Sequence, residues 1–175
     1  EIGVGLVGSE MCIRDSGQLV DAYSRDDSEI IENIRNINSI PLSIDDSLKV
    51  EVELEGVLYT TSSNSKISIE QLLSNSFSNI DNSSSIFFKA FQIFCSKSDE
   101  LSDLTQLQNW GFEVPITLRT DDPRQVKRWH SQWIKNELFS NLPTNGIVAK
   151  CNSSLTKNFL GASPSSPNWA LALTR

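Results

Sequence analysis

Hydrophobic and polar residues alternate most regularly in SLKVEVELEGVLYTT, residues 47–61. Every second residue from Leu48 to Leu54 is aliphatic and the residues between them are charged, which predicts a strand with one buried face. Gly56 interrupts the alternation and predicts an irregularity there. The aromatic-rich run IFFKAFQIFCS, Ile86–Ser96, predicts a second, buried strand.

Other segments also have the pattern of strands. Their apolar residues alternate with polar ones or form short runs beside turn residues. The segment from Ser62 to Ser85 is rich in serine and asparagine and predicts a flexible insertion or a weak helix. The remaining predicted strands are Gly17–Asp27, the VPITLR run at 114–119, Gly146–Asn152 and Asn168–Arg175.

The segment Ser28–Pro41 is the first of three predicted helices. Ser28 is a suitable N-cap, and acidic residues lie in the first turn, where they favour the helix dipole. Ile30, Ile34 and Ile37 recur at helical spacing, and Pro41 predicts the end of the helix.

Two more helices are predicted nearer the C-terminus. Leu101–Phe112 has helical spacing and a glycine, Gly111, at its end. Asp121–Pro143 begins with Asp122 as a cap and Pro123 at the first helical position. Its expected buried face consists of Val126, Trp129, Trp133 and Leu138.

The order of these elements predicts an α+β fold. Strands and helices do not alternate in the rhythm of parallel βαβ units, so antiparallel sheets with flanking helices are expected. The chain has 175 residues, enough to bury a core. Apolar residues make up 38% of the chain and charged residues 21%, values typical of a globular protein.

Charge and composition exclude several classes of function. The net charge is -7, which excludes a general field for binding polyanions and limits any nucleic-acid contact to a local one. No apolar run approaches the roughly 20 residues of a membrane span. The three cysteines are far apart and predict free thiols in a reducing compartment. The single histidine, His130, cannot build a histidine-rich metal site and is interpreted as a surface or helix-packing residue.

The first sixteen residues, EIGVGLVGSEMCIRDS, differ from the rest of the chain. Their glycines lack the spacing of a phosphate-binding loop, and the segment is too short and too acidic at its start for a signal peptide. VGSEMCIRDS resembles the translated read-through of a sequencing-library adapter. Residues 1–16 are therefore expected to be an artefact and disordered, and 17–175 to be a partial domain that begins in mid-domain and stops abruptly.

Lys150 is the best chemical candidate from the residues themselves. A lysine at the end of an apolar strand, beside the Asn145-Gly146 turn, can meet a phosphate as a point charge. Arg25, at the end of another strand, could do the same with forked donors. The alternative is that Lys150 is an ordinary strand-end lysine in solvent.

Acidic pairs and tryptophans provide weaker candidates. The Asp26/Asp27, Asp45/Asp46 and Asp121/Asp122 pairs could suggest metal ligands, but their places before helices and in turns favour capping and solvation. Trp110, Trp129 and Trp133 could stack on bases, although helical spacing of the last two favours core packing.

Four segments occur in an informative order: GQLVDAYSRDD…ENIRNINSIPLSI, VELEGVLY, LTQLQNWGFEV and LPTNGIVAKCN…LGASPSSPNWALAL. They resemble the motifs of the NAD+-dependent DNA ligase family. Those motifs are G-x-L-V-x-A-x-T-R-G-D-G…x-N-V-R-T-I-x-S-I-P-L, L-E-V-R-G-E-V-F, L-x-x-L-x-x-W-G-F-x-V and L-P-x-x-I-D-G-V-V-V-K-V-N…L-G-x-T-S-x-x-P-R-W-A-I-A. The resemblance spans Gly17–Arg175, and its degenerate motifs look most like the DNA ligase B subgroup.

The resemblance implies the nucleotidyltransferase fold of a ligase adenylation domain, with the nucleotide in a cleft between antiparallel sheets. Lys150 matches the family's strand lysine at the adenylate pocket, and Val148 matches the apolar residue packed against the adenine. Arg25 matches the arginine of T-R-G-D-G, and Asn145 stands where the family has an aspartate. The implied cofactors are NAD and Mg2+, and the implied partner is nicked duplex DNA. Replication and repair, a cytoplasmic location and a monomer are also expected.

In the family's reaction, a lysine attacks NAD+ and becomes adenylated, the adenylate passes to a DNA 5′-phosphate, and a 3′-hydroxyl then displaces AMP. The K-x-D-G motif that carries this nucleophile is absent and is expected upstream of Gly17. No catalytic residue is therefore assigned within the chain, which is not expected to be active alone.

Other positions also depart from the family's pattern. Val57 replaces the glutamate of R-G-E, Glu55 replaces the arginine before that glycine, and Thr174 replaces a late lysine. The R-G-D-G turn has become Arg25-Asp26-Asp27-Ser28. Loss of these charged groups leaves open an alternative function, a degenerate, non-catalytic module that binds nucleotide or DNA. An unrelated α+β domain is the third interpretation.

Overall fold

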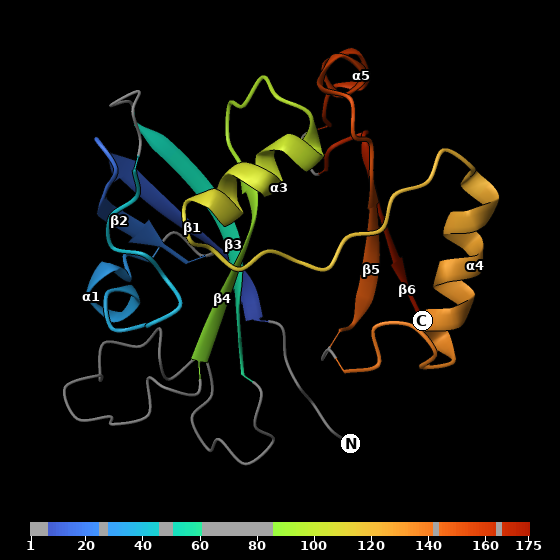
Figure 1. Ribbon diagram of the computed structural model, residues 1–175, viewed down its shortest axis with the longest axis horizontal. Helices are drawn as coiled ribbons and strands as arrows, with labels where there is room; N and C mark the ends of the chain where they lie inside the picture. Colours follow the sequence, from blue (N-terminus) through green and yellow to red (C-terminus); the bar gives the residue numbers. More distant parts are fainter. Residues whose placement is uncertain (1–6, 25–27, 46–50, 61–85, 142–143, 164–165) are drawn as a thin grey trace. The chain divides into compact units, whose positions relative to one another are not determined.

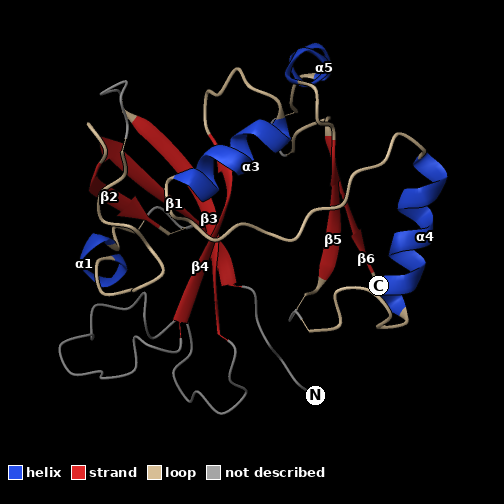
Figure 2. Ribbon diagram, in the orientation of Figure 1, coloured by secondary structure: helices blue, strands red, loops and turns tan. Residues whose placement is uncertain are grey.

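The computed structural model describes residues 7–24, 28–45, 51–60, 86–141, 144–163 and 166–175. The chain divides into two compact units. The first consists of Glu1–Ser96 and Ser102–Pro115, and the second of Lys97–Leu101 and Ile116–Arg175. Helices accompany an antiparallel sheet in each unit, which confirms the predicted α+β class (Figures 1 and 2).

The first unit contains a four-stranded sheet in the order β2-β1-β3-β4, and each neighbouring pair is antiparallel. The sequence patterns predict three of these strands. Gly17 has φ +80° in the tight turn between β1 and β2, where its hydrogen side chain avoids the strain that a Cβ would meet. The strands are β1 (Val7–Asp15), β2 (Gln18–Tyr23), β3 (Val52–Thr60) and β4 (Ile86–Ile93).

Gly56 marks an irregularity in β3, as its break in the alternation predicts. The register between β3 and β4 shifts between Glu55 and Gly56. A Cβ at Gly56 would lie 2.1 Å from Cζ of Phe88, so only glycine lets the Phe88 ring cross the strand here. Leu54 and Leu58, on either side of this position, are fully buried with Phe88.

The segment predicted as the first helix is mostly irregular. Only α1 (Ile31–Ile34) is helical, because the residues before it continue the sheet: Tyr23 bridges to Glu29, and the Ile30 amide donates to the Ala22 carbonyl. Ser28 is consequently not the helix cap. The periodic isoleucines are nevertheless buried, which satisfies the apolar pattern without a long helix; they are Ile30, Ile34, Ile37 and Ile40.

Helix α3 (Glu100–Asn109) confirms the second predicted helix, and Gly111 follows it with φ +89°. Leu104 and Leu107 from this helix are buried. The strand expected over VPITLR is wrong. Glu113 makes a single parallel bridge to Lys89, and the following Pro115 has no amide hydrogen to continue a ladder.

Strand β1 differs most from expectation. We expected residues 1–16 to be disordered, whereas Val7–Asp15 lie between β2 and β3 and pair with both. The physical reason is that a strand in this position satisfies the backbone groups of both neighbours. The adapter origin of the segment stays a prediction.

The inward face of β1 is chemically unusual. Glu10, Cys12 and Arg14 are all fully buried, while Met11 and Ile13 between them are only half-buried. The strand thus turns its polar side chains inward and its apolar ones outward, the reverse of the usual arrangement.

The second unit contains the two predicted strands β5 (Gly146–Lys150) and β6 (Ala170–Thr174), which pair antiparallel with each other. Helix α4 (Pro123–Ile134) begins at the predicted cap, where the Asp122 carboxylate accepts the Arg124 amide. Helix α5 (Ser154–Leu160) has no counterpart among the predicted elements. Among the described residues, no helix combines the length and apolar character needed to cross a membrane.

Candidate functional site

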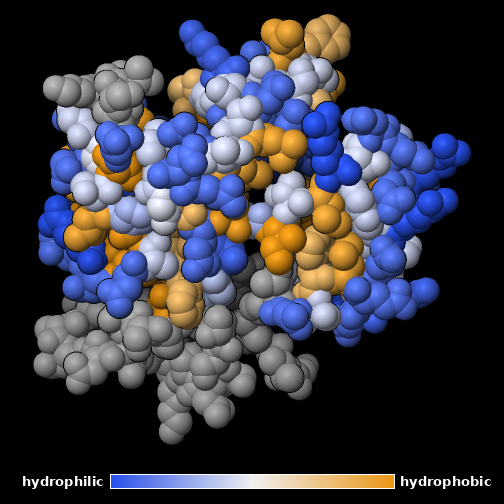
Figure 3. All heavy atoms as spheres, viewed as in Figure 1, coloured by the Kyte–Doolittle hydropathy of each residue, from blue (hydrophilic) through white to orange (hydrophobic). Residues whose placement is uncertain are grey.

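Lys150 is the last residue of β5, opposite Ala170 of β6. At the other end of β5, a Cβ on Gly146 would lie 2.8 Å from the Leu173 carbonyl oxygen, so the strand pair requires glycine there. Val148 precedes Lys150 by two residues and therefore lies on the same face of the sheet. Its side chain is 60% exposed, and Figure 3 shows hydrophobic residues at the surface along β5. The structure thus brings Lys150 and Val148 onto one face.

Two lysines share one buried carboxylate beside this strand. The Lys150 ammonium lies 2.7 Å from Oε1 of Glu100, the first residue of α3. The ammonium of Lys157, from α5, pairs with the other oxygen, Oε2. All three side chains are largely shielded, with exposed fractions of 20%, 14% and 12% for Lys150, Lys157 and Glu100. Water screens these charges less than it screens a surface pair, so the contacts are stronger.

Trp169 borders the same cluster. Its ring centroid lies 5.8 Å from the Lys150 ammonium and 4.8 Å from the Lys157 ammonium, within the range of cation–π attraction. Two positive charges and one negative charge leave a net positive charge beside an aromatic face. Such a cluster suits an anionic group attached to an apolar or aromatic one.

The backbone around the cluster is held by reciprocal hydrogen bonds. The Glu100 amide donates to the Asn152 carbonyl, and the Leu101 amide donates to the Asn152 side chain. In return, the Asp99 carboxylate accepts the Ser154 amide at the start of α5. These contacts satisfy amides at two helix starts and fix Glu100 next to the end of β5.

The other predicted site residues do not join this cluster. Asn145 is exposed and lies at the opposite end of β5, about 16 Å from Lys150 at roughly 3.3 Å per residue. Arg25 lies outside the described residues.

Glu100, Lys157 and Trp169 were missed by the sequence analysis. Glu100 lies 50 residues before Lys150, and no local pattern connects them. Lys157 lies on a helix that was not predicted. Only Trp169, in the matched NWALAL segment, carried a signal, because it lies within the predicted strand Asn168–Arg175.

The described residues do not form a metal site. Among them, no group of three or more histidine, cysteine, aspartate or glutamate side chains is placed to hold an ion. The Glu100 carboxylate is already paired with two lysines. The described residues therefore do not fit a site for Mg2+.

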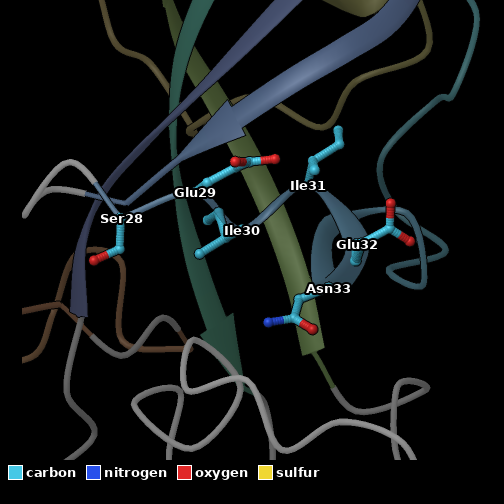
Figure 4. Close-up of a pocket in the computed structure, with 6 residues that line it drawn as sticks. All are labelled: Ser28, Glu29, Ile30, Ile31, Glu32 and Asn33. Atoms are coloured by element: carbon cyan, nitrogen blue, oxygen red, sulfur yellow. The ribbon is translucent and has the colours of Figure 1, made fainter.

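A separate hollow of about 420 Å³ lies in the first unit (Figure 4). One continuous segment, from Ser28 to Asn33, lines it, and Glu29 and Glu32 are its charged residues. The described part of its lining is acidic and holds no cation, which does not suit a nucleotide phosphate. This hollow is not the candidate site.

His130 and the cysteines have structural explanations. His130 stacks on Trp133 and its Nε2 lies 2.9 Å from the Thr174 carbonyl oxygen, which confirms a packing role. All three cysteines are free thiols, as predicted. Burial raises the pKa of Cys12 to about 12, so this thiol is unreactive at neutral pH.

Comparison with known proteins gives the cluster a context. No protein-family model matches the chain. A DNA ligase from Mycoplasma capricolum subsp. capricolum is 30% identical to 91% of the chain, and one from Prochlorococcus marinus is 26% identical to 95% of it. The chain is similar to DNA ligases. A shorter match, 34% identical over 79 residues, is to a DNA ligase from Ehrlichia chaffeensis.

The similarity to these DNA ligases covers only part of each. The chain spans 28% of the Mycoplasma capricolum ligase and 29% of the Prochlorococcus marinus ligase, so it corresponds to less than a third of their length. The chain is thus related to one region of DNA ligases.

Proposed function

We propose that this chain is part of the adenylation domain of an NAD+-dependent DNA ligase, with the nucleotidyltransferase fold, acting on nicked duplex DNA. The observation that carries the proposal is the shared face of Lys150 and Val148, in a chain related to DNA ligases over about nine tenths of its length. A cation and an exposed aliphatic side chain side by side match the two halves of a nucleotide, its phosphate and its base.

Each residue has a physical task in this proposal. Lys150 attracts a phosphate oxygen as a point charge and favours negative charge that develops there. Val148 offers an apolar surface to the flat face of the adenine. Bound NAD+ supplies the AMP group that the reaction transfers. The nucleophile belongs to a motif that this chain does not contain, so the role here is to bind and orient.

The test is to titrate the purified chain with AMP and with NAD+ by isothermal titration calorimetry. We expect Lys150→Gln to weaken AMP binding about tenfold, because one phosphate contact with a charged donor is lost. Lys127→Gln is the matched control, since Lys127 is an exposed lysine on α4 in the same unit. It should bind AMP like the unmodified chain.

A chain that binds neither AMP nor NAD+, or a Lys150→Gln variant that binds AMP as tightly as the Lys127→Gln variant, would overturn the proposal. Circular dichroism of each variant establishes that the folded protein is compared.

A further inference from the structure

The Glu100 carboxylate contacts its two lysines in the way that a bound anion would. One carboxylate oxygen contacts Lys150 and the other contacts Lys157, so two oxygens on a single atom meet two ammonium groups. A phosphate presents its oxygens in the same way, as neighbouring anionic acceptors on one atom. Glu100 therefore occupies the position in which a phosphate would gain the most from both lysines.

We propose that Lys150 and Lys157 together form one phosphate-binding site, and that Glu100 is its internal competitor, which a phosphate-bearing ligand must displace. This inference rests on the proposed function for the identity of the nucleotide, but the anion site itself can be tested without a nucleotide. Trp169, within cation–π distance of both ammonium groups, is the aromatic border of the site.

The geometry favours this role over a purely structural one for Lys157. A lysine that only packs would need one partner, whereas Lys157 shares both its carboxylate and its aromatic neighbour with Lys150. The side chains of Lys157 and Lys150 are 14% and 20% exposed, so part of each side chain is still accessible to solvent. Exposed apolar side chains lie on the same helix as Lys157, including Phe159 at 88%, and Figure 3 shows hydrophobic residues at the surface of α5.

The experiment uses inorganic pyrophosphate as the probe, with binding followed by calorimetry and by the NMR signal of the Trp169 indole, assigned with Trp169→Phe. Glu100→Gln removes the competing charge and retains a hydrogen-bonding group of the same size. We expect it to bind pyrophosphate about tenfold more tightly at low salt, since a nearby like charge is lost. Adding Lys157→Gln to Glu100→Gln should abolish this gain, while adding Lys127→Gln should preserve it.

Structural damage cannot imitate this pattern, because a poorly folded site binds more weakly rather than more tightly. If Glu100→Gln does not fold, Glu100→Asp shortens the competing side chain and should give a gain of about threefold. Pyrophosphate affinity that is unchanged or lower in the folded variant overturns the inference, as does a gain that survives Lys157→Gln. If AMP binding depends on Lys150 but not on Glu100 or Lys157, the inference of a two-lysine phosphate site is wrong, while the proposed function is still supported.

Discussion

Two buried glutamates, Glu10 in the first unit and Glu100 in the second, have opposite surroundings. Both oxygens of the Glu100 carboxylate are paired with ammonium groups. The Oε2 of Glu10 accepts a hydrogen bond from the Leu58 amide, whereas its Oε1 finds no partner among the described residues. Arg14, on the same face of β1, lies over the Phe112 ring at 4.9 Å, and none of its three nitrogens has a hydrogen-bond partner in the part of the chain that the structure describes. Within the described residues, the ionisable groups around Glu100 are thus paired, whereas Glu10 and Arg14 are buried with unpaired polar atoms.

This difference shows which buried charged groups the fold can accommodate. An unpaired charge in an apolar interior is costly, whereas a paired and hydrogen-bonded one can be tolerated. Burial accordingly raises the pKa of Glu10 to about 8 and lowers the pKa of Arg14. An evolved central strand rarely carries two such residues on its inner face. The inner face of β1 is what the predicted adapter origin of residues 1–16 would produce, since such a segment was never selected to fit this sheet.

The largest expected effect is a pH dependence that originates from Glu10. Burial raises its pKa from an ordinary value of 4.5 to about 8, so between these pH values the folded state retains a proton that the unfolded state releases. Stability is therefore full below about pH 4.5 and falls as the pH rises to about 8. At about 1.4 kcal/mol per unit over this range, the loss approaches about 5 kcal/mol. Urea unfolding across this range measures it.

Glu10→Gln should remove most of that slope, while Glu32→Gln, at an exposed site, should retain it. An equal slope in the Glu10→Gln variant would show that Glu10 is already ionised in the fold.

The next effect is the loss of the satisfied cluster. Glu100→Ala leaves two largely shielded lysines without a counter-ion, so we expect the unfolding free energy to fall by about 3 kcal/mol. Thermal and urea unfolding measure the change. A loss under about 1 kcal/mol would mean that the lysines reach water easily and that Glu100 is not their main partner.

Arg14→Met should have the opposite sign. A methionine fills much of the same volume without burying a charge, so we expect stabilisation by about 2 kcal/mol. Arg124→Met, at an arginine whose side chain is 85% exposed, is the matched control and should change stability little. Destabilisation by Arg14→Met would contradict the comparison, because it would reveal a partner for the guanidinium that outweighs its burial.

The smallest effect is expected at a surface ion pair. Arg35 and Glu32 are 3.0 Å apart with exposed side chains, so Glu32→Gln should change the unfolding free energy by no more than about 0.5 kcal/mol. This variant sets the baseline for charge removal where water replaces the partner. If Glu32→Gln lowered the unfolding free energy as much as Glu100→Ala does, burial would not explain the difference between the two glutamates.

Local patterns predict much of the architecture because they report on local physics. Alternation locates β3, short apolar runs locate β5 and β6, and the Asp122-Pro123 pair locates the start of α4. The same reasoning fails for Ser28–Pro41, where Ile30 bonds to the end of β2 instead of starting a helix. Local propensity cannot foresee a competing tertiary hydrogen bond.

The candidate site was predicted only in part, for a similar reason. Lys150 and Val148 were found because they are close in sequence and share a strand. Glu100 and Lys157 were not found, because their roles depend on ion pairs between residues far apart in the sequence. Glu100 lies 50 positions before Lys150 and 57 positions before Lys157.

By itself, the sequence determined the α+β class, most of the strands and the lysine at the end of β5, since periodicity, caps and turns act over a few residues. Only the tertiary structure decided which charges find partners. It joined Glu100 to Lys150 and Lys157, and it buried Arg14 with no hydrogen-bond partner among the residues described. The physical reason is that the energy of a buried charge depends on the groups within a few ångströms of it, which distant parts of the chain supply.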